Sequence, residues 1–95
     1  MFARVVRFTD VTPEAIAAIA ARVEEAGGPP PGVRSNGIRL LHDQEQATAV
    51  FVGLFATRQD LDDADAIFMA MDPAETPGSR ASIDRCQVVI NRDLD

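Results

Sequence analysis

The chain has 95 residues, 46% of them hydrophobic and 25% charged, which predicts one globular domain spanning residues 1–95. Its net charge of −6 excludes nucleic acid as the main partner, because nucleic-acid-binding surfaces need a basic stripe. No segment approaches the roughly 18 apolar residues of a membrane span, and residues 1–4 do not begin a signal peptide. With Cys86 as the only cysteine, no intrachain disulfide can form. We therefore expect a cytoplasmic protein with no membrane partner.

The first half of the chain predicts a strand, a helix and a second strand. Residues Phe2–Thr9 are rich in β-branched and aromatic side chains, as strands are. A helix is expected from the capping residue Thr12 to Gly27, which tolerates a positive φ. Pro29–Gly32 then forms a stiff, extended connector. It leads into a strand over Ile38–Asp43.

The second half predicts a third strand, a helix and a fourth strand. The short polar segment 43–46 indicates a hairpin turn. Residues 47–56 are the most apolar segment and form the third strand, and residues 57–71 form a capped amphipathic helix. Residues 72–82 contain two Pro, Gly and Ser and indicate a loop, and a fourth strand is expected over residues 82–91.

The order β-α-β-β-α-β is that of the ferredoxin-like fold, an α+β arrangement with a four-stranded antiparallel sheet and both helices on one face. The third strand is apolar on both sides, so the uncovered face of the sheet is expected to be apolar too. We expect the helices to cover Val50, Val52 and Leu54. We expect the open face to carry Val6, Phe8, Leu40, Phe51, Phe55 and Val89.

Exposing a large apolar side chain forgoes about 1.5–3 kcal/mol. Leaving all six side chains of the open face exposed would forgo about 10 kcal/mol of favourable burial free energy, which is comparable to the whole stability of a small domain. Such a face should meet a partner, and the commonest partner is a second copy related by a twofold axis. We therefore predict a homodimer formed through the open sheet face.

Polar side chains on the same predicted face are candidate ligand-binding groups. Arg4, Arg85 and Gln87 alternate onto it, and a buried Arg needs a partner. That partner is either an anionic ligand, such as a carboxylate or enolate, or an intersubunit salt bridge or hydrogen-bond network at the dimer interface. His42 is either a general base or a surface residue at the hairpin end. The candidate ligand-binding residues are Arg4, Phe8, His42, Phe51, Phe55, Arg85 and Gln87.

Other reactive residue types do not form a recognisable site. The acidic run Asp60, Asp62, Asp63 and Asp65 lacks the glycine of a calcium loop and is expected to be a solvated helix face. Cys86 is expected to point towards the helices as a buried, inert thiol. The sequence predicts no metal site and no cofactor, and it identifies no catalytic residue.

The chain resembles the dimeric α+β barrel superfamily, and within it the antibiotic biosynthesis monooxygenase-like domains. Pro31–Val33 resembles the Pro-Gly entry to the second strand. Leu40–Asp43 turns into a long apolar third strand, and Val52–Phe55 runs straight into the capped helix start at Thr57–Leu61. Phe55 stands where family members often have Trp, and the chain contains neither Trp nor Tyr. Haem-degrading members use a helical His as iron ligand, whereas His42 lies on a strand.

The resemblance implies a homodimer with a cleft between the helices and the sheet. A small, mostly apolar molecule, or an anionic one, is the expected ligand of that cleft. The alternatives are a cofactor-independent, monooxygenase-like enzyme and a structural interaction module without a ligand. Ligand-sensing regulatory domains share the same element order and are a further alternative. Fold alone does not choose among these functions.

Overall fold

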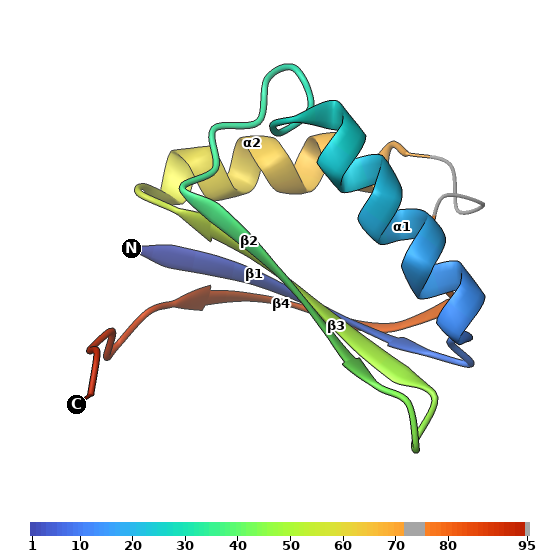
Figure 1. Cartoon of the computed structure of the whole chain (residues 1–95). Helices are drawn as coiled ribbons and strands as arrows, with labels where there is room; N and C mark the ends of the chain where they lie inside the picture. Colours follow the sequence, from blue (N-terminus) through green and yellow to red (C-terminus); the bar gives the residue numbers. More distant parts are fainter. Residues whose placement is uncertain (72–75, 95) are drawn as a thin grey trace.

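The computed structural model describes residues 1–71 and 76–94 and confirms the predicted α+β ferredoxin-like architecture. All neighbouring strands are antiparallel, the sheet order is β2-β3-β1-β4, and both helices lie on one side of the sheet (Figure 1). In chain order the elements are β1 (Phe2–Thr9), α1 (Pro13–Ala26), β2 (Gly37–Asp43), β3 (Thr48–Phe55), α2 (Arg58–Met69) and β4 (Ser79–Gln87). Residues 72–75, which begin the predicted loop, and residue 95 lie outside the described residues. Within the described part, no helix is long and apolar enough to cross a bilayer.

The predicted capping residues start and end the helices. The Thr12 hydroxyl accepts a hydrogen bond of 3.1 Å from the Ala15 N–H, and Gly27 ends α1 with a φ of 68°. The Thr57 hydroxyl accepts an equivalent bond of 3.1 Å from the Asp60 N–H. Each bond satisfies a backbone donor that the first helical turn would otherwise leave free.

The helices cover the face of the sheet that we expected to be open, so that prediction is wrong. The register pairs Val6 with Phe51 and Phe8 with Ala49, and this side packs against Val11 and the first turns of α1. Because β3 is apolar on both sides, strand alternation defines which residues share a face but not which face the helices take. The open face carries Val5, Leu41, Val50, Val52 and Leu54 instead.

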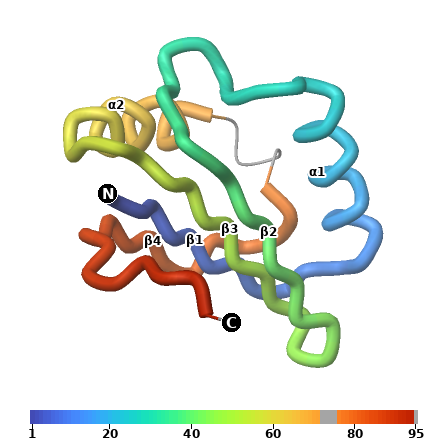
Figure 2. Tube along the Cα trace, turned by 60° about the vertical axis from the view of Figure 1, so that its left-hand side comes forward, coloured from blue at the N-terminus to red at the C-terminus, as the bar shows by residue number. Residues whose placement is uncertain are grey.

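A second cluster fixes α2 against the sheet. Leu61 and Ala64 are completely buried against Phe55, beside Val33 of the connector. The connector approaches α2 closely, because a Cβ added at Gly32 would lie 2.9 Å from the side chain of Ile67. In contrast, α1 has no fully buried residue. Figure 2 shows the two helices standing apart over the same face of the sheet, with α1 towards the β2 edge and α2 towards the opposite edge.

The fourth strand begins earlier and ends earlier than predicted. It pairs with β1 from Ser79 to Gln87, and the register shifts between Arg7 and Phe8. Val89 therefore lies beyond the strand and is almost fully exposed, not part of a sheet face. Cys86 pairs with Ala3 on the open side and is exposed, so its predicted burial under the helices is wrong.

Replacing Leu61 with Ala should lower the free energy of unfolding by about 2–5 kcal/mol, because a cavity opens between α2 and β3. Urea unfolding followed by circular dichroism measures this loss. Met69, on the same helix, is half-exposed, and Met69→Ala should cost about 0.5 kcal/mol or less. Equal losses for the two variants would contradict the packing described here.

Candidate functional site

The sheet register places all seven predicted ligand-binding residues on one face, but it is the face beneath the helices. Arg4 and Phe8 come from β1, and Arg85 lies directly across from Arg4 on β4. In the same way, Phe8 and His42 lie across from Ala49 on opposite sides of β3. The remaining residues of the set, Phe51, Phe55 and Gln87, belong to the same face.

Arg4 finds its partner within the chain. Only 6% of the residue is exposed, and its Nε donates a 2.8 Å hydrogen bond to Oδ1 of Asp65 on α2. The Phe68 ring lies over the guanidinium, with 5.1 Å between its centroid and the guanidinium carbon. A guanidinium is favourably placed against both a carboxylate and an aromatic face. The chain thus supplies the acidic group that we had expected from a ligand or a second subunit.

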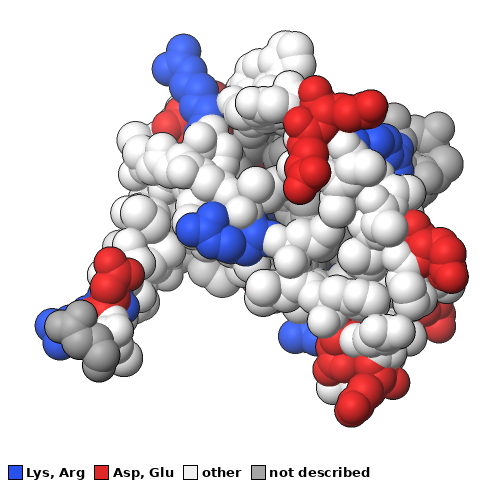
Figure 3. Space-filling model, in the orientation of Figure 1, with Lys and Arg blue, Asp and Glu red and all other residues white. Residues whose placement is uncertain are grey.

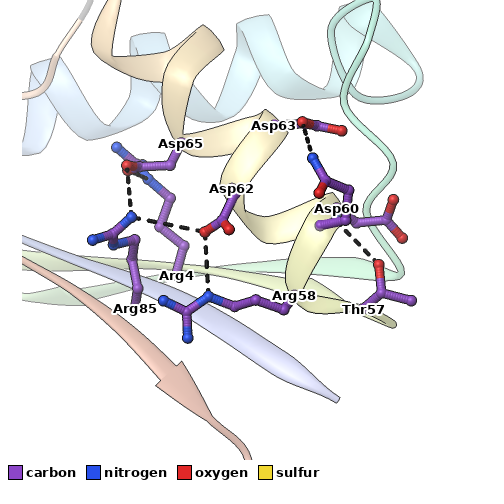
Figure 4. A network of polar contacts seen from close by, with 9 residues as sticks. Arg4, Thr57, Arg58, Asp60, Asp62, Asp63, Asp65 and Arg85 are labelled. Carbon is purple, nitrogen blue, oxygen red and sulfur yellow. Dashed lines mark hydrogen bonds and ion pairs between the residues drawn. The ribbon is translucent and has the colours of Figure 1, made fainter.

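Arg4 and Asp65 belong to a larger network that joins the sheet to α2 (Figure 4). Nη1 of Arg85 lies 3.7 Å from a carboxylate oxygen of Asp62 and 3.7 Å from one of Asp65. Nε of Arg58 lies 3.3 Å from Asp62. The side chains of Arg58 and Arg85 are about half exposed, so water screens their ion pairs more than that of Arg4.

The acidic run on α2 is therefore not uniformly a solvated face. Asp63 fits that prediction, since it is exposed and accepts a 2.7 Å hydrogen bond from Gln59 Nε2. Asp62 and Asp65 point towards the sheet instead (Figure 4). Their spacing of three residues, next to the buried stripe of Leu61 and Ala64, was the available signal for their position.

His42 lies apart from the arginine network, at the β2–β3 hairpin. Its Nε2 is buried and has no hydrogen-bond partner among the described residues. His42 also borders a cavity of about 230 Å³ that includes Arg7 and Asp43. Asp43 accepts hydrogen bonds from the backbone N–H of Gln46 (3.1 Å) and from its side-chain amide (2.7 Å). These bonds, the backbone one first, hold the pKa of Asp43 below its usual value.

A separate apolar cleft of about 160 Å³ lies between α1 and β2. Its walls are Ala20 and Val23 of α1 and Ile38 and Leu40 of β2, with Glu24 as the charged group. Figure 3 shows the surface hollowed beside the acidic side chains at the end of α1. The cleft contains none of the seven predicted ligand-binding residues.

The sequence contained part of the signal for this cleft. Val23 falls at helical spacing on one apolar stripe with Ile16, Ile19 and Ala20. Leu40 was assigned to the open face, and its place beneath the helices follows from the corrected assignment. Ile38 and Val23 both remain more than one-third exposed. The cleft is therefore an apolar surface that the helix covers only in part.

Comparisons with protein-family models, curated proteins and solved structures find no match to this chain. Across residues 1–71 and 76–94, no three His, Cys, Asp or Glu side chains are grouped so that they could hold a metal ion. The α1–β2 cleft can therefore offer a ligand apolar contacts and the carboxylate of Glu24.

Asp65→Asn should lower the free energy of unfolding by about 3 kcal/mol, because it leaves the buried Arg4 guanidinium without its carboxylate. Urea unfolding at fixed protein concentration measures the effect. Asp63→Asn is the matched control and should change stability by about 0.5 kcal/mol or less. Adding Arg4→Met to Asp65→Asn should recover much of the loss. Additive losses in the double variant would show that the two residues are not coupled.

Proposed function

We propose that this protein is a homodimeric α+β barrel protein that binds a small, mostly apolar molecule in the cleft between α1 and β2. The observation that carries the proposal is the incomplete packing of α1. The helix has a clear apolar stripe but no fully buried residue, and the space beside Ala20 and Val23 is lined by side chains that prefer to leave water.

The size and chemistry of the cleft limit its ligand. An apolar cavity of about 150 Å³ accommodates benzene, so a volume of about 160 Å³ suits a compact molecule with one ring, a small fused bicycle or a short branched chain. Glu24 is the only charged group in the lining, and a carboxylate repels anions and accepts hydrogen bonds. A neutral or cationic ligand with one donor group fits this cleft better than an anion.

The homodimer is supported by the composition of the open sheet face. Val5, Val50, Val52 and Leu54 are only half-buried there, and Leu41 is 56% exposed. Side chains of this size favour burial by roughly 1.5–3 kcal/mol each. The segment that follows β4 also lies on the open side of the sheet, away from the helices (Figure 1). A second copy is the commonest partner for such an apolar face.

Indole is a suitable probe of the cleft, because this small fused bicycle is neutral, apolar and compact and carries one N–H donor. The chain has no Trp and no Tyr, so indole fluorescence is read without protein background. We expect saturable binding with a blue shift. Ala20→Phe should fill the cleft and weaken binding at least tenfold.

Ala21→Phe is the control, because Ala21 is the next residue along α1 and is exposed. It should bind indole like the unsubstituted protein. Equal binding by the two folded variants would place the probe elsewhere. No binding by the unsubstituted protein, together with no adduct in native mass spectrometry, would favour a structural module without a ligand.

Leu41→Glu should shift the protein towards monomer, because it would bury a carboxylate in the sheet–sheet contact. Sedimentation velocity at micromolar concentrations measures the distribution of species. Met69→Glu, at a similarly half-exposed position on α2, should leave the dimer intact. An unsubstituted protein that remains monomeric at tens of micromolar would refute the dimer.

A further inference from the structure

One row of residues crosses the whole open face and carries opposite charges at its two ends. The register pairs Arg39 of β2 with Val52, Val52 with Val5, and Val5 with Asp84 of β4. The two valines form the centre, while Arg39 and Asp84 lie on the two edge strands. The row is therefore positive at one edge of the sheet and negative at the other.

Neither charge is neutralised within the part of the chain that the structure describes. Arg39 donates a 2.9 Å hydrogen bond to the carbonyl of Ile38 and makes no ion pair there, and Asp84 makes none either. Both residues are exposed. This contrasts with Arg4 and Asp65 on the other face, which satisfy each other.

We infer that two copies stack their open faces about a twofold axis parallel to the strands, so that Arg39 of each copy meets the partner's Asp84. The inference rests on the homodimer of the proposed function and specifies its geometry. An axis parallel to the strands exchanges the two edges of the sheet, so β2 of one copy lies over β4 of the other. By symmetry the charge pair then forms twice.

The alternative twofold axis, perpendicular to the strands, is disfavoured by the same row. It would place β2 over β2 and β4 over β4, which brings like-charged edges together across the interface. Like charges facing each other across an interface oppose association. Aligned packing of two sheets, with strands within about 30° of each other, is also a common arrangement of sandwiches.

The next row supports the strand-parallel axis through side-chain size. It consists of Gly37, Leu54, Ala3 and Cys86, in order across the four strands. The axis places Leu54 over the partner's Ala3, so a large side chain faces a small one. Alternating large and small residues lets facing sheets interdigitate without gaps.

Arg7 belongs to the third row, nearer the hairpin, and does not obstruct the stack. It lies between Val50 and Ser82 and borders the hairpin cavity of about 230 Å³. The cavity gives its long side chain room to keep the guanidinium in water while its stem covers apolar surface.

The test uses two charge-reversed chains, Arg39→Asp and Asp84→Arg. In a homodimer of either variant, residues 39 and 84 would carry the same charge and would face each other twice across the interface. The Kd of each homodimer, measured by sedimentation velocity, should therefore rise at least tenfold. Mixed in equal amounts, they restore both opposite-charged pairs. The mixture should therefore form a one-to-one heterodimer with a Kd within about threefold of the unsubstituted homodimer. Native mass spectrometry identifies the heterodimer by its mass.

Arg22→Asp mixed with Glu25→Arg is the control, because these exposed α1 residues give the same changes in net charge away from the interface. This mixture should show no preference for the heterodimer. The double variant Arg39→Asp/Asp84→Arg should form homodimers again. Circular dichroism verifies that each variant is folded.

Two outcomes would overturn the inference in distinguishable ways. If the unsubstituted chain dimerises but both reversed chains dimerise equally well, the Arg39–Asp84 contact is wrong while the homodimer stands. If the unsubstituted chain is monomeric at tens of micromolar, the homodimer itself is wrong and the inference fails with it.

Discussion

The docking of α2 on the sheet is the contact on which the rest of the structure depends. Leu61 and Ala64 are fully buried against Phe55, and the buried pair of Arg4 and Asp65 joins the same helix to β1. The apolar contacts provide most of the free energy, because a buried ion pair roughly offsets its own desolvation. The ion pair adds direction, since a misplaced helix would leave a guanidinium buried without a partner.

The position of α2 determines how much of the sheet remains for α1. The α2 helix packs on β1 and β3, and the connector through Val33 and Gly32 is held against it. The α1 helix is left with the β2 side, where its first turns contact the core through Ile16. Further along the helix, Ala20 is too small to reach β2. The apolar cleft is thus a consequence of helix placement and not of a special loop.

Much of the fold follows from local sequence signals, whereas the choice of face does not. The strand alternation and the capping residues Thr12 and Thr57 predict the element order correctly. The same alternation correctly groups Val6, Phe8 and Phe51 on one face. Which face the helices cover depends on long-range contacts, and an apolar strand such as β3 provides no local signal for it.

The candidate site was less predictable for the same reason. Arg4 was expected to need a partner, but its partner Asp65 lies 61 residues away on a helix and is recognisable only once α2 is placed. The end of β4 was misplaced because it depends on the partner strand: Gln87 pairs with Phe2, where β1 begins, and residue alternation in β4 itself does not report this. The α1–β2 cleft depends on how far apart two elements stand, which residue periodicity does not report.

Both faces of the sheet combine apolar side chains with charged residues, but the charges are arranged differently. Beneath the helices, apolar packing is combined with an internal pair, Arg4 and Asp65, that fixes the orientation of α2. On the open face, Val5 and Val52 again form an apolar centre, but the flanking charges of Arg39 and Asp84 make no ion pair within residues 1–71 and 76–94. Apolar contact has no preferred direction, so it would allow several stackings of two sheets. In the proposed homodimer, opposite charges at the two edges would select one of them, because such charges discriminate against misaligned pairs more than they add to affinity.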